Sequence, residues 1–447
     1  MSSFLQRLCL HRPELRAWAM YDWANSGMAA TIVTAVFPVY YLQVVCRDLP
    51  PALATQRHAF ATTLALTFVA LLAPVLGALA DARPLKKRLL SVFLAIGTLA
   101  CAGMFFLGEG EWLLGAVLFM LANIGASGSF VFYDSLLPHV ARPDEMDRVS
   151  TSGYALGYLG GGLLLALNVA WIHFPTAFGL PGPGATGDAA TLPVRLAFVS
   201  VAIWWLVFAL PLLRRVPEPP ARAAVGDRGT LRATMHQLFD TFAALRRYRQ
   251  ATLLLIAFLI YNDGILTIIR MATIYGAEIG LPTAQLIFAI LLVNFVGVPF
   301  AFLFGALAGR VGAKACIYLA LALFVGIGIL GYRLSTPAEF FLLAILVSMA
   351  LGGTQALSRS LFASMIPKSR SSEFFAFFAV AEKFAGILGP LLFAVIIGAT
   401  GGASGSSRLA VLSIVGFFLV GGLLLRLVDV DAGRRQAREA DAAELAA

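Results

Sequence analysis

Long apolar runs recur along the whole chain and constrain its fold more than any other feature of the sequence. Each run holds about 20 residues, enough for one helix to cross about 30 Å of hydrocarbon. Because lipid offers no hydrogen-bond partners, such runs fold as helices that pair their own backbone groups. Hydrophobic residues make up 60% of the 447 residues and charged residues 13%, with a mean hydropathy of +0.85. The sequence therefore predicts an all-α polytopic membrane protein.

About twelve runs meet this description, and a polar segment divides them into two sets. The predicted spans are 17–44, 59–80, 88–107, 112–135, 150–173, 194–213, 250–279, 284–308, 312–332, 338–360, 374–399 and 407–428. The predicted domains are an N-terminal six-helix half (1–213), a cytoplasmic linker (214–249), a C-terminal six-helix half (250–430) and a cytoplasmic tail (431–447). In the linker, "LRATMHQLFDTFAALRR" is typical of an amphipathic helix on the membrane surface.

Short repeats relate the two sets of runs. The segment "GALADARPLKKRLL" (77–90) matches "GALAGRVGAKACIY" (305–318), and each follows the second run of its set. Two six-helix halves in parallel repeat are typical of the major facilitator fold, in which the substrate binds between the halves near the middle of the membrane. We therefore predict this fold, with about twelve transmembrane helices in pseudo-twofold repeat.

The distribution of Lys and Arg predicts how the chain is oriented. About 25 of these cations fall in loops on the side of both termini, against about 5 on the other side. Because cationic loops stay in the cytoplasm, both termini are expected there. This asymmetry and contact with anionic lipid account for the net charge of +9, so no nucleic-acid partner is expected.

Several segments resemble a known family. "YDWANSGMAATIVTAVFPVYY", "SGYALGYLGGGLL", "YNDGILTIIRMATIYGAEIG" and "GGTQALSRSLFASMIPKSR" are similar to the vacuole-effluxer family of the major facilitator superfamily. That family joins the autophagy-related amino-acid effluxer of fungi to many bacterial permeases. The resemblance implies secondary transport of a small solute, and it places the chain on the bacterial branch, as a multi-pass protein of the bacterial inner membrane.

Polar residues at the start of the first run form one helix face. Asp22, Asn25 and Ser26 follow at i, i+3 and i+4. We expect this face to line the central cavity, where the carboxylate would bind a substrate ammonium or take up a proton. The alternative is that Asp22, near the membrane edge, is a solvated or helix-capping acid.

A second polar stripe lies in the span 250–279. Asp263, Thr267 and Arg270 follow at i, i+4 and i+7, and charges within the hydrocarbon are costly unless they are paired or face water. We expect the stripe to line the cavity, with Asp263 as an alternative proton acceptor. Arg270 would bind a substrate carboxylate, or else pair with Asp263 on its own face.

Other candidates for the cavity carry weaker signals. Glu382 and Lys383 are adjacent, and their side chains diverge by roughly 100°, so we expect each to find a partner on another helix. Lys383 is a second candidate to bind a substrate carboxylate. Gln355 lies in a span expected to line the path. Tyr154 and Tyr158 lie one turn apart and would either line the cavity or pack against a neighbouring helix.

The loop after the second run is a candidate gate on the cytoplasmic side. Asp81 ends the run, where it would meet a helix N-terminus or an arginine across that face, and Arg83 would tether the loop. The second copy of the repeat has Gly309 in place of the acid. For Lys86 the alternative is that the loop cations only set topology.

Alignment of the repeats predicts a further gate contact. Matching "YDSLLP" with "SRSLFASMIP" places Asp134 opposite Arg359, at equivalent ends of two cavity-lining helices. We predict an ion pair between them when the cytoplasmic side is closed. In the alternative, Asp134 pairs with the loop 142–148 and Arg359 with Glu382.

The residues disfavour catalysis. The five histidines are scattered without metal-ligand spacing, and the sequence has no Walker loop. We expect no catalytic residues, metal or cofactor. The predicted function is secondary transport of small solutes, namely amino acids or related zwitterions, coupled to protons. The protein is expected to function as a monomer in lipid. The alternative is export of lipophilic or drug-like compounds or lipids.

Overall fold

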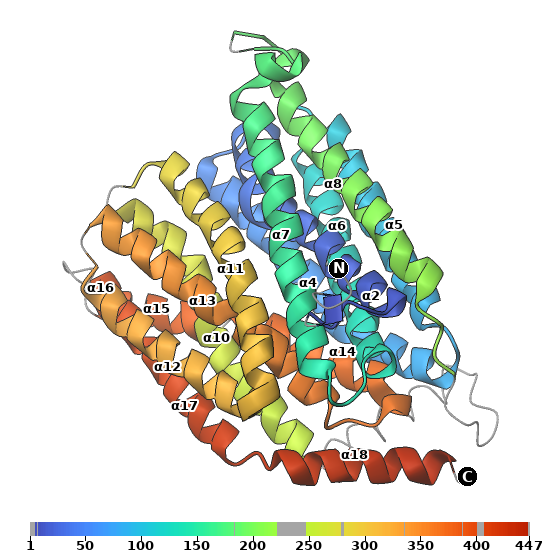
Figure 1. Cartoon of the computed structure of the whole chain (residues 1–447). Coiled ribbons are helices and arrows are strands. Elements are labelled where there is room, and N and C mark those ends of the chain that lie inside the picture. The colour runs from blue at the N-terminus through green and yellow to red at the C-terminus, as the bar shows by residue number, and fades with distance from the viewer. Residues whose placement is uncertain are drawn as a thin grey trace.

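The computed structural model describes residues 5–6, 8–182, 184–220, 247–278, 281–334, 336–386, 388–399 and 406–445. Within these ranges the regular structure is helical, and the long helices form two groups that lie side by side (Figure 1). Among the described residues, eleven helices are long and apolar enough to cross a membrane. The predicted all-α membrane fold is confirmed.

The N-terminal half contains the first six spans. Its elements are α2 (Pro13–Met28), η1 (Ala29–Ala35), α3 (Phe37–Tyr40), η2 (Tyr41–Val45), α4 (Pro51–Ala82), α5 (Lys86–Gly103), η3 (Met104–Phe106), α6 (Trp112–Val140), α7 (Met146–His173), η4 (Pro175–Phe178) and α8 (Asp188–Arg215). The first span is one continuous path from α2 to η2. Pro38 lies in the first turn of α3, where its missing N–H costs little.

The C-terminal half repeats the pattern. Its elements are α10 (Arg249–Glu278), α11 (Thr283–Val311), α12 (Ala313–Tyr332), α13 (Pro337–Ala363), η5 (Lys368–Arg370), α14 (Ser371–Phe384), α15 (Leu388–Ala399), α16 (Ser406–Ser413) and α17 (Val415–Arg426). A capping box starts α13, because Thr336 Oγ1 accepts from the Glu339 N–H while the Glu339 carboxylate accepts from the Thr336 N–H.

The eleventh predicted span differs from the prediction of one helix over 374–399. The structure divides it into α14 and α15. Gly386 lies between them with φ of +83°, a left-handed conformation that favours glycine and ends a right-handed helix. Pro390 in the first turn of α15 also suits a helix start.

The C-terminal tail holds a helix that the sequence analysis does not predict. Helix α18 (Val430–Leu445) lies across the ends of the transmembrane helices (Figure 1). Asp441 Oδ1 accepts from the Lys368 N–H at 2.9 Å, and Arg434 Nε donates to Ser364 Oγ at 3.2 Å. The amphipathic helix predicted in the linker lies mostly outside the described residues.

The halves meet most closely at one end. Helix α7 packs against α11 and α13, and α4 packs against α14. We call this end the basic end, because it carries the cationic loops 83–88, 142–148, 310–314 and 368–370. Contacts between the halves close the basic end, and this closure places the charged side chains described next.

Candidate functional site

A buried arginine of the C-terminal half is held by two carboxylates of the N-terminal half. Arg359 of α13 places Nη1 3.0 Å from Asp134 Oδ1 of α6 and Nη2 3.3 Å from Asp22 Oδ2 of α2. Its Nε donates to Ser150 Oγ at 2.9 Å, and Nη2 donates to the Ser150 carbonyl at 3.0 Å. Arg359 is 1% exposed. Because all three charges are withdrawn from solvent, each depends on the others for compensation.

Aromatic rings enclose the same guanidinium group. Its Cζ lies 4.5 Å from the ring centroid of Tyr154, 4.9 Å from that of Trp18 and 5.5 Å from that of Tyr133. Trp18 and Tyr133 stack with their centroids 4.5 Å apart. The Tyr133 hydroxyl donates to Asp22 Oδ2 at 2.6 Å. Since aromatic faces attract cations, the rings and the carboxylates act together on Arg359.

The repeat alignment predicts contact between Asp134 and Arg359, and the structure contains this ion pair. The two residues therefore pair with each other. The alternatives were a pair of Asp134 with the loop 142–148 and a pair of Arg359 with Glu382. Asp22 is 3% exposed, so it is not a solvated acid at the membrane edge. Sequence reasoning missed that Asp22 joins the pair, although its position on a cavity-facing helix was the available signal.

Close approach of α2 and α7 allows the cluster to form. A Cβ atom at Gly153 would lie 2.5 Å from Asp22 Oδ2 and 3.2 Å from Arg359 Nη2. A Cβ atom at Gly157 would lie 2.7 Å from Ser26 Oγ. Glycine at these positions lets the two helices pack with their backbones close together.

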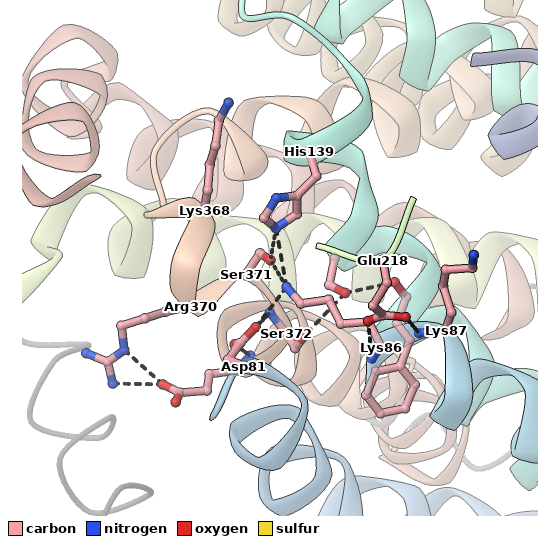
Figure 2. Close-up of polar contacts among 12 residues, drawn as sticks. Asp81, Lys86, Lys87, His139, Glu218, Lys368, Arg370, Ser371 and Ser372 are labelled. Carbon is pink, nitrogen blue, oxygen red and sulfur yellow. Dashed lines mark hydrogen bonds and ion pairs between the residues drawn. The ribbon is translucent and has the colours of Figure 1, made fainter. Parts of the chain in front are cut away.

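A second polar cluster joins the halves at the basic end (Figure 2). Asp81, in the last turn of α4, accepts from the N–H groups of Ser372 at 3.2 Å and Glu373 at 2.8 Å, in the first turn of α14. Lys86 Nζ lies 2.8 Å from Asp81 Oδ1 and donates to Ser371 Oγ at 2.7 Å. A carboxylate at a helix N-terminus satisfies free N–H donors and the helix dipole.

Two residues that sequence reasoning missed extend this cluster. His139 Nε2 lies 3.3 Å from Lys86 Nζ and 3.2 Å from Ser371 Oγ. The Glu218 carboxylate accepts from the N–H groups of Lys86 and Lys87 at 2.7 and 2.9 Å, which caps α5 (Figure 2). Lys86 thus has defined partners in addition to its effect on topology. Arg83, the other predicted gate residue of this loop, is exposed at the C-cap of α4.

A cavity of about 350 Å³ lies between the halves, on the side away from the basic end. Its wall is mostly apolar and comes from α10, α11, α12 and α13, with polar contributions from Ser26, Thr34, Tyr158 and Asn294. The Tyr158 ring is 6.4 Å from the ring of Tyr154, which packs on Arg359. Tyr154 thus lies between the cavity wall at Tyr158 and the arginine cluster.

The polar stripe of α10 contacts the break between α14 and α15. Asp263 is 1% exposed and accepts from the N–H groups of Leu388 at 3.1 Å and Gly389 at 2.7 Å. Arg270 Nη1 donates to the Gly386 carbonyl at 2.7 Å. Thr267 Oγ1 donates to the Asp263 carbonyl at 2.7 Å. The stripe thus satisfies backbone groups that the broken helix leaves without partners.

The remaining candidates are more dispersed. Lys383 Nζ lies 3.4 Å from Glu382 Oε1, so these neighbours pair with each other, whereas the sequence predicts a partner for each on another helix. Their Cβ atoms diverge, but both side chains are long and partly exposed in the last turn of α14, and they bend towards each other. Asn25 is buried, Ser26 lines the cavity and Gln355 is half-buried in α13.

Sequence comparisons agree with this architecture. The chain matches the family described as "Vacuole effluxer Atg22 like" over residues 55–438. It is 33% identical over 420 residues to the uncharacterized MFS-type transporter YxiO of Bacillus subtilis, covering 92% of this chain and 94% of the relative. Autophagy-related protein 22 of Saccharomyces cerevisiae is 28% identical over 408 residues, covering 79% and 74%.

Solved structures share the fold. The human organic anion transporter MFSD10 superposes with a TM-score of 0.68 at 14% identity, over 93% of this chain and 99% of the other. The major facilitator proton:xylose symporter XylE gives 0.68 at 14% identity, over 96% of each chain. The predicted major facilitator fold is confirmed, and the relatives are transporters rather than enzymes. The chain belongs to the vacuole effluxer Atg22-like family of membrane transporters.

Proposed function

We propose that this protein is a secondary transporter of amino acids or related zwitterions, which works by alternating access and is coupled to protons. In the proposed orientation it lies in a bacterial inner membrane with both termini in the cytoplasm, and it acts as a monomer. The basic end then faces the cytoplasm. A structure closed at this end, with a cavity towards the other, is the outward-open state of the cycle.

The observation that carries the proposal is the contact of Arg359 with Asp22 and Asp134 across the two halves. Because the arginine and the acids belong to different halves, the contact holds only while the basic end is closed. The hydrogen bonds from the start of α14 to Asp81 of α4 also join the two halves, so they too hold only while the basic end is closed. Two sets of polar contacts that break together provide a two-state element, which alternating access requires.

Charge supports proton coupling. The cluster combines two carboxylates with one guanidinium, so it carries a net negative charge when both acids are ionised. Once Arg359 leaves, Asp22 and Asp134 lose their shared cation, and such a pair of carboxylates favours uptake of a proton or a substrate ammonium. Asp263 is already bound to α15, so Asp22 is the better proton acceptor.

The cavity supports a small solute. Its volume of about 350 Å³ suits a single amino acid, whose side chain would contact the apolar wall. The same apolar wall is the observation that favours the alternative, export of lipophilic compounds. The two functions differ in whether the charged cluster takes part in binding.

Counterflow in proteoliposomes tests the proposal. Purified protein is reconstituted with one unlabelled amino acid at a time, and uptake of the same labelled amino acid is followed at two pH values. We expect exchange that depends on pH. Asp22→Asn should remove this pH dependence, whereas Arg47→Gln, which removes an exposed ion pair with Glu109, should leave it intact. Efflux of lipophilic dyes with no exchange of any amino acid would contradict the proposal and support the alternative.

A further inference from the structure

We propose that Trp18, Asp22, Tyr133, Asp134 and Tyr154 form a binding site for organic cations, which Arg359 fills as a tethered ligand while the basic end is closed. We name these five residues the cation box. The inference rests on the proposed transport function, because it assigns the box to the positively charged head of the substrate. The ligand class is an ammonium or guanidinium group on a small organic molecule.

All members of the cation box come from the N-terminal half, whereas its occupant comes from the other half. Trp18 and Asp22 lie on α2, Tyr133 and Asp134 on α6, and Tyr154 on α7. Two carboxylates contact the guanidinium and three rings surround it at 4.5–5.5 Å. Carboxylates combined with aromatic faces are the arrangement by which proteins bind alkylated ammonium groups.

Contacts within the N-terminal half hold three members of the cation box, Trp18, Asp22 and Tyr133, in place without the arginine. The Tyr133 hydroxyl fixes Asp22 through a bond of 2.6 Å, and Trp18 Nε1 donates to the Tyr133 carbonyl at 3.0 Å. The rings of Trp18 and Tyr133 stack on each other. Because none of these contacts involves α13, this part of the box is expected to persist when α13 withdraws Arg359. Such a preformed site loses little conformational freedom on binding a ligand.

Withdrawal of Arg359 leaves two carboxylates without the cation that they share. A substrate in the cavity reaches them past Tyr158 and Tyr154, whose rings are adjacent. Its cationic head would then occupy the place of the guanidinium, so that substrate and Arg359 exclude each other. Closure of the basic end would therefore release the substrate head from the box, and opening would admit it.

Chemical rescue of Arg359→Ala tests the cation box directly. Removing the side chain vacates the box, and ethylguanidinium supplies the missing group as a free cation. N-ethylurea has nearly the same shape but no charge, and serves as the matched additive. We expect ethylguanidinium at about ten times its dissociation constant to raise the thermal unfolding midpoint of the purified variant by about 2 °C, with saturation, and N-ethylurea to have no such effect. Ethylammonium should stabilise the variant in the same way.

Two control variants and a second substitution make the outcome decisive. Ethylguanidinium should not stabilise Arg359→Ala/Asp134→Asn, which lacks one carboxylate, or Arg47→Ala, which removes an exposed arginine. If Arg359→Ala does not fold, Arg359→Gln vacates the charge with less loss of volume and takes its place. The inference would be overturned if ethylguanidinium and N-ethylurea had equal effects, or if ethylguanidinium stabilised neither Arg359→Ala nor Arg359→Gln. The assay measures binding without transport, so a failed counterflow experiment leaves its result standing, and the reverse also holds.

Discussion

Arg359 and Asp134 lie 225 positions apart in the chain, yet Nη1 of the arginine is 3.0 Å from Oδ1 of the aspartate. Each residue sits near the basic end of a helix, and the two helices belong to different halves. The pair is almost fully buried and lies beside a second acid, Asp22. Buried polar contacts between the two halves therefore add to the helix packing that closes the basic end.

Gly153 allows the contact between Asp22 and Arg359, so we expect Gly153→Ala to disturb it. A Cβ atom there would lie 2.5 Å from Asp22 Oδ2, and relief of this overlap should cost about 1–3 kcal/mol of stability. Counterflow per folded molecule should fall as well. Gly128→Ala is the matched control, because its Cβ would meet the Phe93 ring at 2.4 Å within one half. It should lose stability and keep transport. Equal transport by the two variants would show that Gly153 has no special role.

Two buried acids should respond differently to loss of charge. Asp263 accepts from two N–H groups of α15, so Asp263→Asn should lower stability by about 1–2 kcal/mol. It should keep the pH dependence of transport. Asp22→Asn should remove that pH dependence, because Asp22 contacts the guanidinium of Arg359, which leaves the site when the basic end opens. Thermal unfolding combined with counterflow over a pH series measures both effects. If only Asp263→Asn abolishes the pH dependence, the assignment of the proton acceptor is reversed.

Lys86 compensates a buried carboxylate, so Lys86→Met should be strongly destabilising. The Lys86 ammonium is 2.8 Å from Asp81 Oδ1, and both side chains are nearly inaccessible. Removal of one partner from a buried pair costs about 3–5 kcal/mol. Lys87→Met is the control, because Lys87 binds Glu218 through its backbone N–H, which the substitution retains. Its effect should stay within about 0.5 kcal/mol. Similar unfolding midpoints for the two variants would argue against a structural role of the Lys86 ammonium.

The sequence predicts the helices well because the membrane imposes one length and one composition on them. Apolar runs of about 20 residues have few other ways to fold in lipid. The break at Gly386 is harder to predict, since a glycine within a membrane helix is common and its φ depends on packing. Helix α18 lacks an apolar run, and contacts such as Asp441 with Lys368 place it.

The candidate site could be predicted in part. The internal repeat brings Asp134 opposite Arg359, because equivalent helix ends meet when the halves close. No comparable symmetry relates Asp22 to this pair, and its participation depends on how closely α2 approaches α7 at Gly153. For Asp263 the position could be predicted from the sequence, but the contacts could not. Its helical stripe is clear in the sequence, but its partners are N–H groups that become available only because the facing helix is broken.

A reversible cross-link at the basic end tests alternating access most directly. Ser135 of α6 and Ser372 of α14 come from different halves, and their Oγ atoms are 3.2 Å apart. A disulfide between Ser135→Cys and Ser372→Cys would therefore lock the halves together. The controls are each single cysteine variant under the same oxidant, and a cysteine pair at Asn168 and Ser200, which contact each other within one half. We predict that the cross-link between the halves stops counterflow and that a reducing agent restores it, while the controls keep transporting. Unchanged transport by fully cross-linked protein would contradict the account.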